Sequence, residues 1–377
     1  MQPVCFSDRL LRVCRNPCIF APIFSSYHHS EVLQYEKITA LLLALMMPVC
    51  ILAGCTKQKD LEKNNPDKTG KLKVVTTIFP EYDWVREILG DKAENAELTM
   101  LLDNGVDLHS YQPTADDIVK ISTCDLFIHV GGESDGWVEG ALKNAANKNV
   151  KVINLMEVMG NSVKAEETIE GMQGTDHDHE HEDADEHDEE DGHDHENNAE
   201  YDEHVWLSLK NAEILVGAIS DALQELDPEN KDTYAANADA YVKKLSALDA
   251  DYRAAVAGAA YKTILFGDRF PFRYLVDDYG LSYYAAFAGC SAETEAGFDT
   301  ITFLAGKVDE LGLPCVMTIE GARHKIAETI VQNTAAKNQK VLTMDSMQST
   351  TSKDAANGTT YLSVMEKNLS VLKQALG

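Results

Sequence analysis

The strongest constraint on the fold is an alternation of short β-branched stretches with stretches of helical periodicity, which occurs in two successive series. The predicted strands of the first series lie at 73–78, 97–102, 126–130 and 150–154. Those of the second series lie at 263–266, 282–287, 315–319 and 340–343. Alternation of this kind produces mostly parallel sheets with helices on both faces. The sequence therefore predicts the α/β class, with two similar lobes.

A long amphipathic stretch separates the two series. Asp227 and Pro228 suit the cap and first turn of a helix that continues to about residue 256. One face of this helix carries Tyr234, Ala238, Tyr241, Leu245, Leu248 and Tyr252. At 1.5 Å per residue the helix reaches roughly 40 Å, long enough to span both lobes. We therefore predict an N-terminal lobe at 72–226, a linking helix at 227–258 and a C-terminal lobe at 259–377.

The N-terminal region has the pattern of a lipoprotein leader. An uncharged apolar stretch at 38–54 ends in Leu-Ala-Gly-Cys at 52–55, which resembles a bacterial lipobox. Cleavage before Cys55 would remove 1–54 and leave a cysteine that carries a lipid anchor. The polar segment 55–71 then suits a flexible tether. The alternative is a single transmembrane anchor, which the length favours but the lipobox ending does not.

An acidic, histidine-rich run at 176–196 contains thirteen Asp or Glu, six His and no Lys or Arg. Its low content of apolar residues predicts a disordered loop, at about 172–199. Its histidines are proposed as auxiliary metal ligands: His177, His179, His181, His187, His193 and His195. The alternative is a solvated charge run. The net charge of −29 also excludes nucleic acid as a partner, since counterion release needs Lys and Arg.

Beyond the leader and Cys55, three cysteines remain: Cys124, Cys290 and Cys315. They have no CxxC spacing, which argues against a zinc knuckle or a redox motif. Three thiols allow at most one disulfide, and Cys290 with Cys315 is the pairing considered.

Four histidines lie outside the leader and the acidic run. His109 follows a predicted strand and precedes a helix, and His204 precedes another helix. Both positions belong to the edge where ligands of open α/β sheets bind, so two such lobes predict a cleft site between them. His129 lies within an apolar strand and is interpreted as a hydrogen-bonded core residue. His324 is the fourth.

Several motifs resemble the metal-specific solute-binding proteins of zinc and manganese ABC importers. They are Gly-Val-Asp-Leu-His-Ser-Tyr-Gln-Pro at 105–113, Glu-His-Val-Trp-Leu at 203–207, the Asp-Pro helix start at 227–228 and Ile-Ala-Glu-Thr-Ile at 326–330. The similarity extends over 74–376. It implies two α/β lobes joined by a rigid backbone helix, with the metal bound between the lobes by a pair of ligands from each.

The resemblance also implies a set of metal ligands. The N-terminal pair falls on His109 and His204, whose imidazoles suit Zn(II). The last ligand of the family is a carboxylate after the final strand, and Asp345 occupies that place.

The remaining ligand position departs from the family pattern. The histidine or glutamate expected five residues before Tyr274 is Arg269, which has only donors and cannot ligate. Either the neighbouring Asp268 supplies a carboxylate, or water completes the site and Asp268 pairs with Arg269. Glu320 follows another strand of this lobe and is a weaker candidate than Asp268.

Two features disagree about the metal. Two imidazoles with two carboxylates lean towards Mn(II), whereas the histidine-rich run suits Zn(II), to which we give more weight. The predicted function is an extracytoplasmic, lipid-anchored and monomeric receptor that delivers Zn(II) to an ABC-transporter permease. A manganese receptor and a surface adhesin or storage protein are the alternatives. A zinc hydrolase is disfavoured, because the sequence lacks HExxH, Gly-x-Ser-x-Gly and phosphate-binding motifs.

Overall fold

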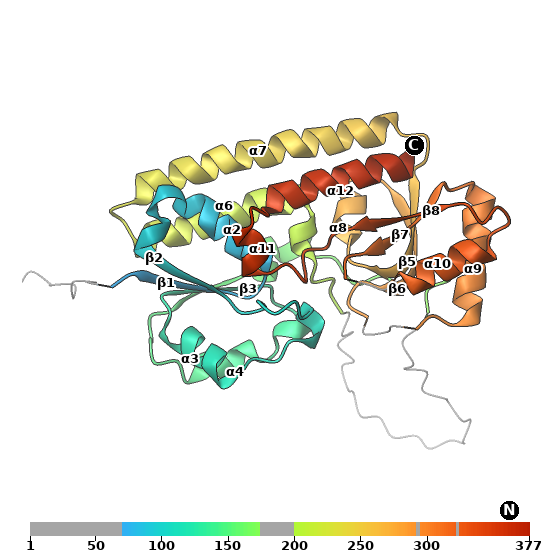
Figure 1. Ribbon diagram of the computed structural model, residues 1–377. Coiled ribbons are helices and arrows are strands. Elements are labelled where there is room, and N and C mark those ends of the chain that lie inside the picture. Colours follow the sequence, from blue (N-terminus) through green and yellow to red (C-terminus); the bar gives the residue numbers. More distant parts are fainter. Residues whose placement is uncertain (1–69, 174–199, 292–294, 322–323) are drawn as a thin grey trace, which may run out of the picture. The chain divides into compact units, whose positions relative to one another are not determined.

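A computed structural model describes residues 70–173, 200–291, 295–321 and 324–377 (Figure 1). Its first sheet is parallel throughout and has the strand order β2-β1-β3-β4. The strands are β1 (Leu72–Thr76), β2 (Ala96–Met100), β3 (Leu126–His129) and β4 (Lys151–Asn154). Each strand lies within two residues of its predicted bounds.

The second sheet repeats this arrangement, with the order β6-β5-β7-β8 and parallel pairing throughout. Its strands are β5 (Thr263–Phe270), β6 (Ser282–Ala288), β7 (Cys315–Ile319) and β8 (Lys340–Met344). In both sheets the first strand in the chain lies second in the sheet. The prediction of two similar α/β lobes is therefore confirmed.

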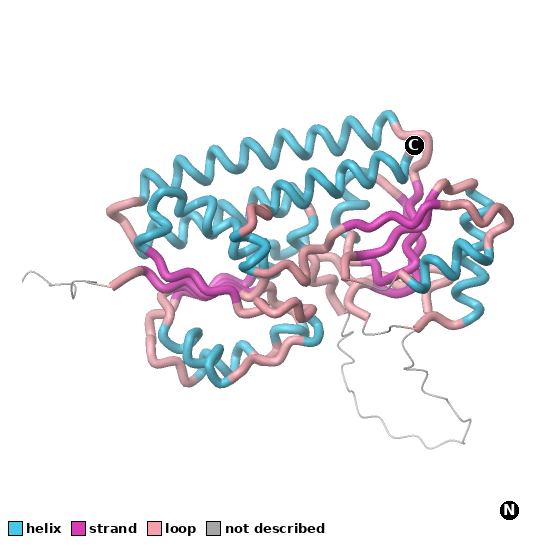
Figure 2. Tube along the Cα trace, viewed as in Figure 1, coloured by secondary structure: helices cyan, strands magenta, loops and turns pink. Residues whose placement is uncertain are grey.

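Helices cover both faces of each sheet (Figures 1 and 2). Those of the N-terminal lobe are α2 (Phe79–Leu89), α3 (Ala115–Thr123), α4 (Val138–Lys143), α5 (Leu155–Met159) and α6 (Leu209–Leu226). The C-terminal lobe contains α8 (Arg273–Tyr279), α9 (Phe298–Leu311) and α10 (Lys325–Asn333), whereas α11 (Ser352–Ala356) lies against the N-terminal lobe, where Ser352 donates to Asp103 (Figure 1). Among the described residues no helix is both long enough and apolar enough to cross a membrane.

Two further helices span both lobes: α7 (Lys231–Gly258) and α12 (Tyr361–Leu376). The six residues predicted to form the apolar face of α7 are all buried. Helix α7 packs on α2 and α6 of the first lobe, and α12 packs on β8 and also on α2 (Figure 1). The sequence predicted this bridging role for α7 but placed α12 in the C-terminal lobe alone. The lobe boundaries at 226 and 259 stay a prediction. The contact of α12 with α2 shows that part of the segment assigned to the C-terminal lobe also packs on the N-terminal lobe.

The start of α12 is anchored inside the N-terminal lobe. The Tyr361 amide donates to Asp83 at 2.8 Å, and its ring meets the edge of Trp84 with centroids 5.2 Å apart. The Tyr361 hydroxyl donates to the Trp206 carbonyl at 2.7 Å, and the Trp206 indole donates to the Ser346 carbonyl of the C-terminal lobe at 2.9 Å. A single buried apolar cluster consequently runs through both lobes.

Strand β5 is longer than predicted. The sequence ended it at Phe266, but pairing with β6 resumes after a register shift and continues to Phe270. Asp268 and Arg269 therefore lie near the carboxyl end of strand β5. Apolar packing of Phe270 against Tyr283, with stacked rings 3.8 Å apart, holds the added residues in the sheet.

A disulfide between Cys290 and Cys315 is wrong. Cys124, Cys290 and Cys315 are all free thiols in the described structure. Cys315 begins β7, whereas Cys290 follows the carboxyl end of β6. All strands of this sheet are parallel, so Cys315 lies at the amino ends of the strands and Cys290 lies at their carboxyl ends.

The predictions for 1–54, for the tether and Cys55, and for the histidine-rich run fall outside the described residues. The chain is described up to Gln173 before the run and again from Glu200 after it. Residues 163–173, here called the crossing segment, leave the N-terminal lobe and lie along the C-terminal one. Two backbone hydrogen bonds hold this segment against the C-terminal lobe. The Lys164 amide donates to the Tyr274 hydroxyl at 3.0 Å, and the Gln173 amide donates to the Ala286 carbonyl at 2.9 Å.

A buried carboxyl at the start of α2 makes stability depend on pH. Burial raises the pKa of Glu81 from 4.5 to about 8, with a further contribution from Asp135, although the Thr77 and Ile78 donors oppose the shift. Between these two pKa values the Glu81 carboxyl of the folded protein keeps a proton that the unfolded chain releases. The free energy of unfolding therefore falls as the pH rises from 4.5 through about 8.

We predict that Glu81→Gln becomes progressively more stable than the parent protein as the pH is raised from about 5 to about 9, by at most about 1.4 kcal/mol per pH unit. Urea unfolding of both proteins across this range measures the difference. The exposed Glu97→Gln is the control and should keep the parent slope. Parallel pH profiles for Glu81→Gln and the parent would contradict the prediction.

Candidate metal centre

His109 lies beyond the carboxyl end of β2, in a short 3-10 helix formed by Leu108–Ser110. Asp107 caps this turn by accepting the His109 amide at 3.0 Å. The ring Nδ1 lies 2.9 Å from Ser134 Oγ and 3.5 Å from the Glu203 carboxylate. These partners orient the ring so that its Nε2 faces His204.

His204 is fully buried where the N-terminal lobe meets the C-terminal one. Its Nδ1 lies 2.9 Å from Asp202 Oδ1, which also accepts the His204 amide. The Asp202 carbonyl accepts the hydroxyl of Tyr274 from the C-terminal lobe at 2.8 Å. The second imidazole is therefore oriented like the first, with a carboxylate beside Nδ1 and with Nε2 turned towards the other ring.

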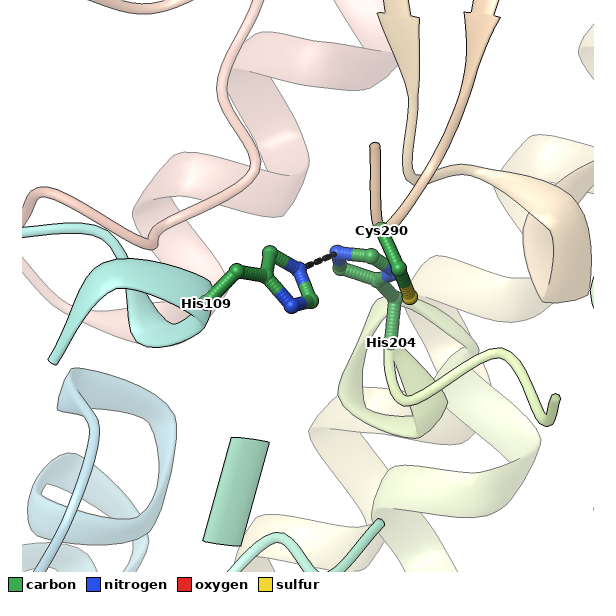
Figure 3. A group of neighbouring side chains, drawn as sticks. All are labelled: His109, His204 and Cys290. Carbon is green, nitrogen blue, oxygen red and sulfur yellow. Dashed lines mark hydrogen bonds between the residues drawn. The ribbon is translucent and has the colours of Figure 1, made fainter. Parts of the chain in front are cut away.

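The two Nε2 atoms face each other, with that of His109 3.2 Å from that of His204 (Figure 3). Two atoms that both bind Zn(II) at 2.0–2.1 Å in a tetrahedral site are about 3.3 Å apart. The observed separation has this value. Among the sequence-predicted ligands these are the pair that the structure brings together.

Burial and the neighbouring His204 ring lower the pKa of His109 from 6.5 to about 3. The imidazole is therefore neutral over the physiological range. The two rings are hydrogen-bond partners through their Nε2 atoms, and a cation bound by both nitrogens would replace this hydrogen bond. Neutral imidazole is also the form that binds transition metals.

A third potential ligand, Cys290, completes the group (Figure 3). Its Sγ and the ring nitrogens of the two histidines all lie within 4.8 Å of one another. Cys290 was not among the site residues predicted from the sequence motifs. The available signal was topological, because Cys290 follows a strand at the same sheet edge as Glu320 and Asp345.

Arg269 takes the place of the family ligand on β5, and its guanidinium pairs across the lobes with Asp107 at 2.6 Å. Asp268 points elsewhere. One of its oxygens accepts the Thr318 hydroxyl of β7 at 2.6 Å, and the other accepts the Arg269 amide at 2.9 Å. Asp268 thus lies outside the group of three ligand atoms, and neither carboxylate oxygen is left without a donor.

Asp345 and Glu320 form a separate acidic pair. Glu320 accepts both the amide and the hydroxyl of Ser346 at 2.7 Å, and Asp345 accepts the Met347 amide at 2.8 Å. Burial, with the charge of Asp345, raises the pKa of Glu320 from 4.5 to about 7. Neither belongs to the group formed by the two histidines and Cys290, and Asp345 as a ligand stays a prediction.

The other histidines have different surroundings. His129 is buried in β3, its Nδ1 lies 3.0 Å from Asp135, and its ring stacks on Phe127, as expected of a core residue. The Nδ1 of His324 lies 3.1 Å from the Thr318 hydroxyl. Both are therefore satisfied by protein partners.

Residues 74–375 match the family described as ZnuA, the periplasmic component A of the zinc-uptake complex. The chain belongs to this family. The zinc-binding lipoprotein AdcA of Streptococcus pneumoniae is 33% identical over 339 residues, which cover 90% of this chain and 61% of that protein. The high-affinity zinc uptake system protein ZnuA of Bacillus subtilis is 30% identical over 332 residues, covering 88% and 96%. The chain spans 56% to 61% of the length of the AdcA proteins that it matches.

Solved structures of this family have the same fold. The Zn(II)-bound ZnuA-like domain of Streptococcus pneumoniae AdcA has a TM-score of 0.61 and 29% identity, covering 81% of this chain and 99% of that one. The metal-dependent lipoprotein YcdH of Bacillus subtilis has a TM-score of 0.63 and 26% identity, with the same coverage. This similarity agrees with the resemblance found from the sequence motifs.

We predict that Asp202→Ala weakens zinc binding by about 10- to 100-fold, because His204 loses the carboxylate that orients its ring. Competition with a chelator of known zinc affinity measures the change. Asp239→Ala, an exposed position on α7, is the matched control and should bind like the parent protein. Unaltered affinity in Asp202→Ala would contradict a role for this carboxylate in positioning the imidazole.

Proposed function

We propose that the protein is the zinc receptor of an ABC importer, which captures Zn(II) between its lobes and delivers it to a membrane permease. The observation that carries this proposal is the pair of imidazole nitrogens, 3.2 Å apart, each with a carboxylate behind it. Both side chains come from elements that meet the C-terminal lobe. The ion would be cargo, and its capture requires no catalytic step.

Membership of the zinc-uptake family supports zinc as the cargo. The chemistry of the pair supports it too, because imidazole nitrogen suits Zn(II) better than it suits Mn(II), which prefers oxygen ligands. A manganese receptor would need the carboxylates of Asp268 and Asp345 in the site. Asp268 instead accepts hydrogen bonds from Thr318 and the Arg269 amide, so this alternative is less well supported.

We further propose that the mature protein is held on the outer side of the membrane by an acylated Cys55. The support is the Leu-Ala-Gly-Cys ending at 52–55, together with the lipoprotein character of the AdcA relative. Cys55→Ala should move the protein from the membrane fraction to the soluble extracytoplasmic fraction. An unchanged membrane fraction for this variant would favour the transmembrane alternative.

Binding measurements on the full chain test the metal site. We expect His109→Ala and His204→Ala each to lose zinc affinity by at least about 100-fold, more than is usual for a change in a residue that only orients a ligand. Deletion of residues 176–196 should leave one tight site intact, because the paired imidazoles lie outside the run. Loss of all tight binding on deletion of the run alone would overturn the proposed site.

Uptake measurements separate the importer from a surface adhesin or storage protein. Cells that lack this protein should take up radioactive zinc poorly at limiting concentration. The parent chain should restore uptake, whereas His204→Ala should not, although it reaches the membrane in equal amount. Normal zinc uptake in the deletion strain, with lowered manganese uptake, would favour the manganese alternative.

A further inference from the structure

We propose that Cys290 is the third protein ligand of the metal, bound through its Sγ as a thiolate, so that the centre is a His-His-Cys site. This inference rests on the proposed function and specifies the ligand set and metal selectivity of the same centre. It replaces the ligand that Arg269 cannot provide. The remaining position is left to water or to a carboxylate.

The geometry supports a shared ion. In a tetrahedral site with Zn–N of 2.0–2.1 Å and Zn–S of about 2.3 Å, nitrogen and sulfur are about 3.6 Å apart. The three candidate ligand atoms already lie within 4.8 Å of one another (Figure 3). Closing a gap of about 1 Å requires only a change in the cysteine side-chain torsion or a small loop movement.

The loop after β6 is built to bring Cys290 against His204. A Cβ at Gly289 would lie 3.2 Å from the His204 ring and 2.9 Å from the Phe270 carbonyl, so a side chain there would displace the loop. The Cys290 amide donates to Glu166 of the crossing segment at 2.7 Å. The backbone on both sides of the thiol is therefore fixed close to the imidazole.

Arg269 acts as a positioning residue instead of a ligand. Its guanidinium binds Asp107, two residues before His109, at 2.6 Å, and donates to the carbonyl of Ser291, the residue after Cys290, at 3.4 Å. One planar cation thus connects the loop of the first imidazole with the loop of the thiol. Its five fixed donors suit this bridging role.

The other cysteines of the described body do not approach this centre. Cys124 is fully buried in the N-terminal lobe, where its Sγ donates to the Ile121 carbonyl at 3.2 Å. Cys315 is buried at the opposite edge of the second sheet. Cys290 alone among these three is partly exposed and has imidazoles beside it.

A thiolate ligand changes what the centre selects. On binding, the thiol releases its proton to solvent and the sulfur donates an electron pair to the ion. The two neutral imidazoles and one thiolate then offer borderline and soft donors with a single negative charge. Such a set favours Zn(II) over Mn(II), which takes carboxylate and water oxygens. The chemical class of cargo is therefore a borderline or soft divalent cation.

Cobalt(II) serves as the spectroscopic probe, because thiolate bound to cobalt gives a near-ultraviolet charge-transfer band that nitrogen and oxygen ligands do not. We expect the full chain to show this band with one equivalent of Co(II). Cys290→Ser should lose the band and weaken zinc binding by about 100-fold or more, which exceeds the loss expected for a residue that only orients a ligand. Cys124→Ser, in which the hydroxyl can keep the bond to Ile121, is the matched control and should retain both.

A second measurement uses the unaltered protein, which covers the case in which Cys290→Ser does not fold. Alkylation followed by peptide mapping should modify Cys290 in the metal-free protein and spare it when zinc is bound. Modification of Cys290 that is independent of zinc would overturn the proposal. Cys290→Asp should also lower the ratio of zinc to manganese affinity by about tenfold or more, since a hard oxygen replaces sulfur.

The outcomes distinguish the two proposals. Co(II) bound by His109 and His204 without a thiolate band would overturn the role of Cys290 and leave the receptor function standing. A band that persists in Cys290→Ser would assign it to another cysteine and would likewise overturn the ligand assignment. Absence of tight cobalt and zinc binding by the full chain would overturn both.

Discussion

The structure depends on one continuous apolar core that passes from the first sheet to the second. Helices α7 and α12 each bury one face in this core, and both pack on elements of the two lobes. Burial of a large apolar surface resists separation of the lobes, because opening would expose it to water. The core therefore fixes the distance between the loops of the first lobe that carry His109 and His204 and the loop of the second lobe that carries Cys290.

Polar contacts refine the junction that the core creates. Trp206 links the segment of His204 to the loop after β8, and Tyr274 holds the carbonyl of Asp202. Arg269 pairs with Asp107 across the junction. Each contact lies within a few residues of a candidate ligand, so the same groups that join the lobes also orient the site. This coupling suits the proposed receptor function, in which a small ion is bound in a fixed geometry.

The candidate ligands differ in how well they could be foreseen. His109 and His204 belong to motifs in which an imidazole follows a strand or precedes a helix, and their convergence matches the expectation. Cys290 was missed because Glu166 and His204, which lie beside its loop, are far from it in the sequence. Asp268 was selected for its position beside Arg269, but a longer β5 directs its carboxylate to Thr318 of the neighbouring strand.

The sequence by itself determined the α/β class, the two series of parallel strands, the long helix between them and the two imidazoles, because these depend on local periodicity and short motifs. Tertiary structure decided which groups share a centre with those imidazoles. It brought Cys290 to them, paired Arg269 with Asp107 and placed α12 against the first lobe. The physical reason is that strand register and packing between lobes arise from contacts between distant residues, and a one-residue change in where a strand ends redirects a side chain to another partner.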